Sequence, residues 1–129
     1  MDFTGVIIEE SLENPSVLKK VSILKTGVEK VTEKHKTPHL QQWTMHTISV
    51  AEDKAEEIAQ EVSNSLDIQH AWYADFKNDA FHYVIFKNKV FKVDRSRPSQ
   101  YEAVVAYGVS KGIPDYQLDF SPDIKEWER

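Results

Sequence analysis

The sequence predicts a single α+β domain, with an antiparallel sheet and two helices packed on one face of that sheet. The 129 residues are 40% hydrophobic and 29% charged, a balance typical of one soluble core. Short segments rich in β-branched and aromatic residues outnumber the two segments whose apolar residues recur at helical spacing. Proline and glycine are sparse and scattered, so no linker divides the chain. We expect one domain over residues 1–120 and a charged tail over residues 121–129.

The N-terminal residues predict a β-rich extension of this core. Residues 3–11 contain three consecutive β-branched residues and predict a first strand. Pro15 favours the first position of a short helical turn that ends near Lys20. Residues 22–32 then alternate weakly between apolar and polar side chains. The remaining elements follow from stronger patterns.

A strand and a helix are expected next. Residues 42–50 are mostly β-branched or aromatic and predict a strand. A capping box, formed by Ser49 with Glu52 or by Asp53 with Glu56, predicts the start of a helix. The apolar residues that recur at helical spacing, and that we expect to be buried, are Ala55, Ile58, Ala59, Val62 and Leu66.

The C-terminal half predicts an antiparallel meander followed by a second helix. Asparagine-containing loops join the three β-prone runs, and Asn88 can adopt the positive φ that a tight turn needs. Pro98 favours the first turn of the second helix, which ends near Gly112. The order strand, helix, three strands, helix is that of a ferredoxin-like sandwich. The expected strands are residues 71–76, 81–86 and 90–94, with a possible last strand at 116–120.

Strand alternation divides the meander into two apolar faces. We expect the two hairpins to place Phe76 opposite Phe81 and Phe86 opposite Phe91. Two helices cover only one face of such a sheet, so the other needs the N-terminal residues, a second copy or a ligand. One face holds Tyr73, Asp75, His82, Val84, Phe86, Phe91 and Val93, and the opposite face holds Trp72, Ala74, Phe76, Phe81, Tyr83, Ile85 and Lys92.

Composition excludes several classes of function. The chain has no cysteine, which excludes disulfide bonds, thiolate zinc sites and cysteine nucleophiles. Its net charge of -5 lacks the positive field that binding to nucleic acid requires. The N-terminus shows no signal peptide and no segment has the length of a membrane span, so we expect a cytoplasmic protein without a membrane partner. No cofactor is expected.

Asp75 and His82 form the candidate catalytic pair. In the predicted register they lie directly opposite each other, and a carboxylate beside an imidazole can orient it as a general base. The same pairing also satisfies a half-buried histidine in many structures. The sequence contains no Gly-x-Ser-x-Gly motif that would supply a nucleophile.

The start of the second helix is the candidate anion site. Its unsatisfied N–H groups and positive dipole end favour anions, and arginine and serine side chains gather there. The alternative is that the arginines are solvated or paired with Asp94. The candidate anion-binding residues are Arg95, Ser96, Arg97 and Ser99.

The histidines do not predict a metal site. His35 and His39 have the spacing that places two imidazoles on one face of a helix, but Pro38 argues against a helix there. His46 and His70 lie on separate predicted strands or strand ends. We therefore expect no bound metal.

Three segments resemble a family of small bacterial proteins that has no assigned activity. They are residues 72–79, 84–95 and 107–120, and the resemblance extends over nearly the whole chain. It implies a stable single-domain bacterial protein and supplies no catalytic residues.

We predict a non-enzymatic binding or interaction domain, with a homodimer formed through an aromatic sheet face. The alternative is a small enzyme or small-molecule sensor that uses Asp75 and His82, with Arg95 or Arg97 holding an anionic ligand. The residues predicted for the aromatic interface or ligand face are Trp43, Trp72, Phe76, Phe81 and Tyr83.

Overall fold

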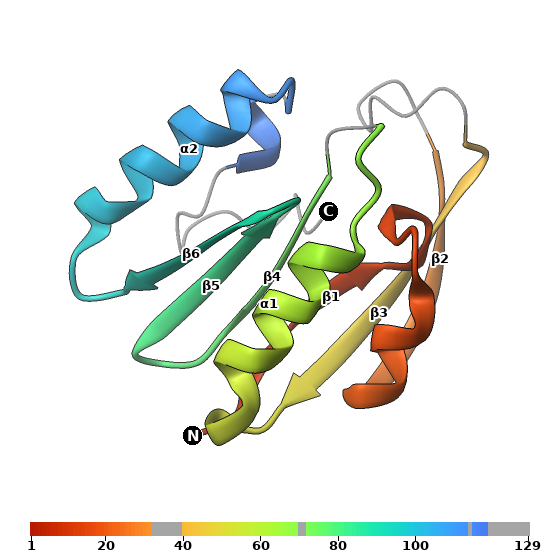
Figure 1. Ribbon diagram of the computed structural model, residues 1–129, viewed down its shortest axis with the longest axis horizontal. Helices are drawn as coiled ribbons and strands as arrows, with labels where there is room; N and C mark the ends of the chain where they lie inside the picture. Colours follow the sequence, from red (N-terminus) through yellow and green to blue (C-terminus); the bar gives the residue numbers. More distant parts are fainter. Residues whose placement is uncertain (32–39, 70–71, 114, 119–129) are drawn as a thin grey trace.

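The computed structural model describes residues 1–31, 40–69, 72–113 and 115–118. It confirms the α+β class (Figure 1). The described elements, in chain order, are β1 (Phe3–Ile8), η1 (Glu9–Ser11), η2 (Pro15–Lys20), β2 (Ser22–Lys30), β3 (Gln42–Val50), η4 (Glu52–Lys54), α1 (Ala55–Ser65), β4 (Tyr73–Lys77), β5 (Phe81–Phe86), β6 (Lys89–Asp94), η5 (Pro98–Gln100), α2 (Tyr101–Ser110) and η6 (Asp115–Leu118), where η marks a 3-10 helix.

Within these residues the strands form one six-stranded antiparallel sheet in the order β2-β3-β1-β4-β5-β6. The N-terminal strand β1 is therefore not an extension: it lies in the middle of the sheet, between β3 and β4 (Figure 1). Gly5 allows this close pairing, because a Cβ at that position would lie only 1.9 Å from the backbone oxygen of Asp75.

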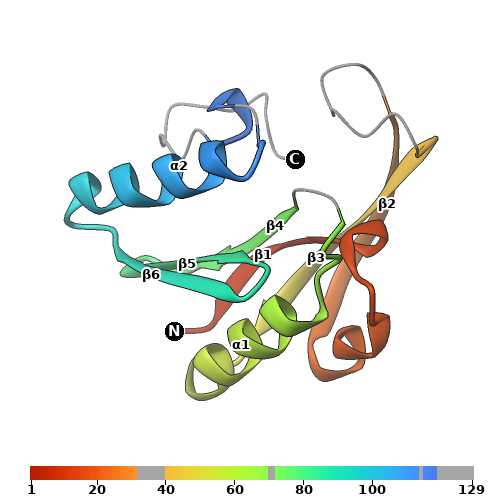
Figure 2. The ribbon, with the colours of Figure 1, turned by 45° about the horizontal axis from the view of Figure 1, so that its top comes forward.

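The two helices lie on opposite faces of the sheet, which corrects the prediction that both pack on one face (Figure 2). The buried residues of α1, such as Ile58 and Val62, belong to one core cluster with Phe76. Val104 of α2 belongs to a second cluster with Val84. Because successive residues of β4 and β5 point to opposite sides and are apolar on both, each face needs its own helix.

The predicted division of the meander into faces is confirmed by the two clusters, but its register is wrong by two residues. Phe76 pairs with Tyr83 and not with Phe81, and Phe86 pairs with Lys89. A shift of two residues leaves every side chain on its predicted face. The first turn begins at Asn78, whose Oδ1 accepts hydrogen bonds from the N–H groups of Ala80 and Phe81 at 2.9 and 2.8 Å.

The helix ends differ in detail from the predictions. The predicted turn from Pro15 is confirmed as η2, where Asn14 Oδ1 accepts a hydrogen bond from the N–H of Ser16 at 3.2 Å. Neither capping box forms, because the 3-10 turn η4 leads into α1 without a side-chain cap. Asn88 has the predicted positive φ, at 60°.

The predicted last strand at 116–120 is wrong where the structure describes it, because residues 115–118 form η6. This short helix packs against α2: Leu118 is 1% exposed, and its side chain occupies the space beside Gly108. The predicted tail, residues 121–129, lies outside the described part of the chain.

Candidate functional site

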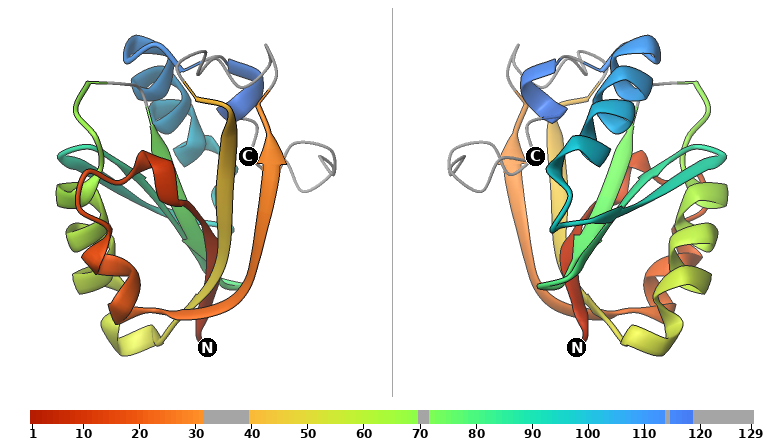
Figure 3. Two further views of the ribbon diagram at one scale, coloured as in Figure 1. Left: turned by 90° about the vertical axis from the view of Figure 1, so that its right-hand side faces the viewer. Right: turned by 90° about the vertical axis from the view of Figure 1, so that its left-hand side faces the viewer.

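The aromatic face predicted as an interface is largely interior. Trp43, Trp72, Phe76 and Tyr83 are all buried, and Phe81 is half-buried. α1 covers the face that contains Phe76, and η2 lies beside α1 (Figure 3). The chain itself therefore covers this face of the sheet. These side chains are closed off by their own domain, so they offer no aromatic surface for a partner.

Asp75 and His82 meet as predicted, although they are diagonal neighbours and not directly opposite. His82 Nε2 lies 2.6 Å from Asp75 Oδ2, while Asp75 pairs with Val84 in the ladder. The other ring nitrogen, Nδ1, lies 2.7 Å from the hydroxyl of Tyr101 on α2. The sequence did not predict this third member. The resulting chain, Asp75–His82–Tyr101, joins β4 and β5 to the start of α2.

Burial dominates the electrostatics of these three side chains. The His82 side chain is 3% exposed and that of Asp75 is 17% exposed. Burial also raises the pKa of the Tyr101 phenol, while the nearby Arg95 guanidinium acts to lower it. Tyr101 therefore stays a neutral hydroxyl over the physiological pH range. The described contacts are those of a buried polar link that holds α2 on the sheet.

The predicted anion-binding residues do not converge on one point. The N–H and hydroxyl of Ser96 both donate to Asp94 Oδ1, at 2.9 and 2.7 Å, and these bonds lower the pKa of Asp94. Arg95 donates through Nη1 to the backbone oxygen of Asn78 at 2.6 Å. Arg97 and Ser99 are exposed. Ser96 and Arg95 thus serve the local turn and its contact with the β4–β5 loop.

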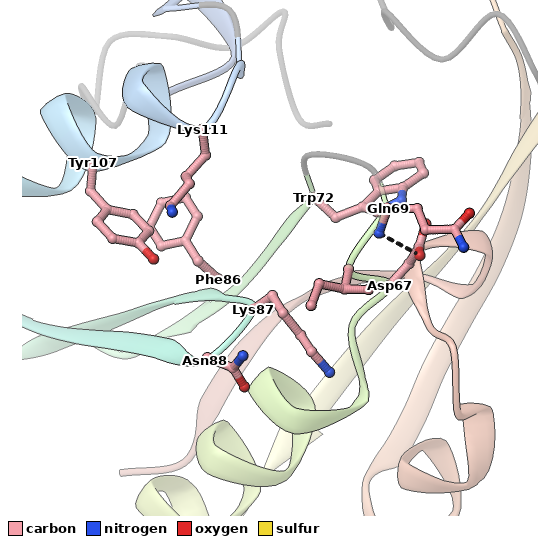
Figure 4. Close-up of a pocket in the computed structure, with 9 residues that line it drawn as sticks. Asp67, Gln69, Trp72, Phe86, Lys87, Asn88, Tyr107 and Lys111 are labelled. Atoms are coloured by element: carbon pink, nitrogen blue, oxygen red, sulfur yellow. Dashed lines mark hydrogen bonds between the residues drawn. The ribbon is translucent and has the colours of Figure 1, made fainter.

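A different group of residues forms a cavity of about 360 Å³. It lies between the C-terminal end of α2, the β5–β6 turn and the connection from α1 to β4 (Figure 4). This volume falls in the range of small-ligand sites. The lining residues are Asp67, Ile68, Gln69, Trp72, Phe86, Lys87, Asn88, Tyr107 and Lys111.

Aromatic walls and two ammonium groups give the cavity its chemistry. Trp72, Phe86 and Tyr107 supply the aromatic surface. Lys111 Nζ lies over the Tyr107 ring, 5.4 Å from its centroid. Lys87 Nζ donates to the backbone oxygen of Asn64 at 2.6 Å, which holds this ammonium group against the C-terminal end of α1.

Two further residues of the cavity lining carry polar groups. Asp67 Oδ1 accepts a hydrogen bond from the N–H of Gln69 at 2.9 Å. Trp72 is 6% exposed, and its indole Nε1 is buried without a hydrogen-bond partner in the described structure. A buried N–H donor without an acceptor costs about 1–3 kcal/mol.

The sequence signals for this cavity were weak. Trp72 was predicted for the aromatic interface or ligand face, and Phe86 was placed on the opposite face of the meander. Lys87, Tyr107 and Lys111 belong to a turn, a helix and a helix end that are distant in sequence. No local spacing connects such residues, because the packing of α2 on the sheet brings them together.

Metal binding finds no support in the described residues, where no group of three or more histidine, aspartate or glutamate side chains is placed to hold an ion. His35, His39 and His70 lie outside the described residues. Both ring nitrogens of His46 make hydrogen bonds within the protein. Nε2 lies 3.0 Å from Glu9 Oε1, and Nδ1 lies 2.9 Å from Thr26 Oγ1. Across the same described ranges, no helix is both long and apolar enough to cross a membrane.

Comparison with protein families, curated proteins and solved structures finds no match for this chain. The resemblance to a bacterial family stays a prediction from the sequence. Any function must therefore be argued from the side chains described above.

Proposed function

We propose that this protein binds a small anionic molecule with a flat apolar body, in the cavity between α2 and the β5–β6 turn. The observation that supports this most directly is the combination of aromatic walls with the ammonium groups of Lys87 and Lys111 in a space of about 360 Å³. Sites for small molecules are typically apolar cavities with a few polar groups that fix orientation.

The charges favour an anion over a neutral ligand. Two lysines and one aspartate line the cavity, so the local charge is positive although the whole chain carries -5. Asp67 already accepts a hydrogen bond from its own loop. A carboxylate on the ligand would receive charge-assisted hydrogen bonds from Lys111 and Lys87.

Calorimetric titration with benzoate and with hexanoate tests the proposal, because both carry a carboxylate on a small apolar body. Benzamide, which has the shape of benzoate without its charge, is the matched control ligand. We expect benzoate to bind more tightly than benzamide, and added salt to reduce this difference. If neither carboxylate binds, or if benzamide binds as tightly as benzoate, the proposed ligand class is wrong.

Matched variants locate the binding. Lys111→Ala is expected to weaken benzoate binding about tenfold, since it removes one charge-assisted contact. Lys77→Ala removes an equally charged, exposed lysine that does not line the cavity and should leave binding unchanged. Trp72→Phe keeps an aromatic ring and removes only the buried N–H donor, so binding should weaken less than in Lys111→Ala. Equal affinities for all three variants would place the ligand elsewhere.

For Asp75, His82 and Tyr101 we propose a structural role in place of the enzymatic alternative. Both ring nitrogens of His82 are engaged, and the imidazole is almost completely enclosed. None of the three residues lines the described cavity. A location in the cytoplasm stays a prediction from the sequence.

A further inference from the structure

We propose that the edge strand β2 pairs with β2 of a second copy of this chain, in an antiparallel two-fold dimer. β2 is the terminal strand in the sheet order, and no described strand lies on its outer side (Figure 3). It extends over nine residues, Ser22–Lys30, whereas β6 at the opposite edge has six. A long exposed edge is a template for pairing with another strand.

Three large apolar side chains of β2, those of Ile23, Leu24 and Val28, are exposed. Leu24 is 61% exposed and Val28 is 63% exposed. The bulge in the pairing with β3 lies between Ile23 and Lys25, so residues 25–30 form a regular stretch. Thr26 Oγ1 bonds to Nδ1 of His46 at 2.9 Å, which ties the middle of the strand to β3. The edge is therefore regular and anchored.

Symmetry limits the registers that such a dimer can use. Hydrogen-bonded and non-hydrogen-bonded residue pairs alternate along an antiparallel ladder. A two-fold axis must map each pair onto a pair of the same kind. The axis must therefore lie at the level of one residue, which pairs with the same residue of the second copy. It cannot lie midway between two successive residues. Within the regular stretch, the central candidates are Thr26, Gly27 and Val28.

Charge complementarity selects the axis at Gly27. In this register Lys25 lies directly opposite Glu29 of the second copy, and symmetry repeats the pair. An axis at Thr26 would place Glu29 opposite Ile23, and an axis at Val28 would place it opposite Gly27. Neither alternative brings opposite charges together directly.

The other side of the strand and its central glycine fit the same register. Side chains alternate, so Val28 would lie beside Thr26 of the second copy, on the side away from the charges. At Gly27 a Cβ would meet nothing within 4 Å in the chain itself. A glycine at the axis permits close approach of the two backbones.

A charge-swap series followed by sedimentation of the full-length chain tests the pairing. We expect the unmodified protein to shift from monomer to dimer over about a hundredfold range of concentration. Lys25→Glu and Glu29→Lys should each weaken dimerisation about tenfold, since each replaces two attractive pairs with two repulsive ones. The double variant Lys25→Glu/Glu29→Lys should restore it, which also shows that the variants fold. A monomer at every concentration, or single variants that dimerise normally, would overturn the proposal.

Cross-linking tests the register separately. The chain has no cysteine, so Gly27→Cys introduces a single thiol that faces its own copy across the axis. We expect this variant to form a disulfide-linked dimer under mild oxidation. Val109→Cys, at an exposed position on α2, is the matched control and should stay monomeric. Faster cross-linking through Thr26→Cys than through Gly27→Cys would overturn the proposed axis.

Discussion

The face of the sheet under α1 and the face under α2 differ in how they hold their helix. Under α1, aromatic rings pack directly: Phe3 lies 5.7 Å from Phe76 and 5.3 Å from Tyr83 between ring centroids. Under α2, the apolar cluster is smaller and the Asp75–His82–Tyr101 chain lies beside it. The α1 face therefore combines a large apolar cluster with a buried hydrogen bond, from the Ser63 hydroxyl to the Phe86 backbone oxygen at 2.6 Å. The α2 face combines a smaller apolar cluster with a series of hydrogen bonds between three side chains.

The described cavity lies beside α2. Rings and aliphatic side chains can fill a face closely, because apolar packing has no required direction. A helix positioned by specific hydrogen bonds is held at a set place even where its neighbours leave space. The cavity opens at the C-terminal end of α2, at the end opposite the Tyr101 contact.

The largest expected effect comes from truncating the α1 face. Phe76 is 0% exposed, so Phe76→Ala should lower the free energy of unfolding by about 3–5 kcal/mol. Phe91→Ala, at a half-buried position on the α2 face, should cost about 1–2 kcal/mol. Urea denaturation of both variants measures the comparison. Equal losses would show that the two faces contribute equally.

Gly5→Ala tests the strand contact between the two halves of the sheet. Its Cβ would lie 2.5 Å from Phe76 Cα, and because backbone atoms of a central strand cannot move aside, we expect a loss of about 3 kcal/mol. Gly27→Ala is the matched control, since its Cβ meets nothing in the chain. Denaturation midpoints that fall equally for both variants would contradict the clash.

Breaking the polar chain on the α2 face should have an intermediate effect. His82→Phe leaves the Asp75 carboxylate and the Tyr101 hydroxyl without the imidazole, and we expect a loss of about 2 kcal/mol. Tyr101→Phe should cost about 1 kcal/mol. Because the residues share one network, the double variant should lose less than the sum of the two. Additive losses in a double-mutant cycle would show that the contacts are independent.

The smallest effect is a dependence of stability on alkaline pH. Burial raises the folded-state pKa of Tyr101 above the usual value near 10, so the unfolded chain loses this proton first. The stabilisation is present below that value and is lost as the pH rises through the folded-state pKa. Denaturation of the unmodified protein and of Tyr101→Phe at increasing pH isolates this contribution. Identical pH profiles would contradict the burial of the phenol.

Local patterns predicted most elements because their physical causes are local. The helical spacing of Ile58, Ala59 and Val62 identified the buried side of α1, and Asn88 identified its turn. The Asp75–His82 contact survived a register error because a shift of two residues keeps both side chains on one face. The error lay in where each hairpin turns: the last ladder pairs are Lys77 with His82 and Phe86 with Lys89, so the turns lie at residues 78–81 and 87–88.

By itself, the sequence determined the α+β class, the main strands, the buried stripe of α1 and the two apolar faces of the meander. These follow from residue types at short range, whose periodicity reports the local backbone. Only the tertiary structure decided that β1 enters between β3 and β4, that the helices take opposite faces, and that Trp72, Lys87 and Lys111 share a cavity. Such contacts join segments far apart along the chain, and their energies depend on how whole elements pack.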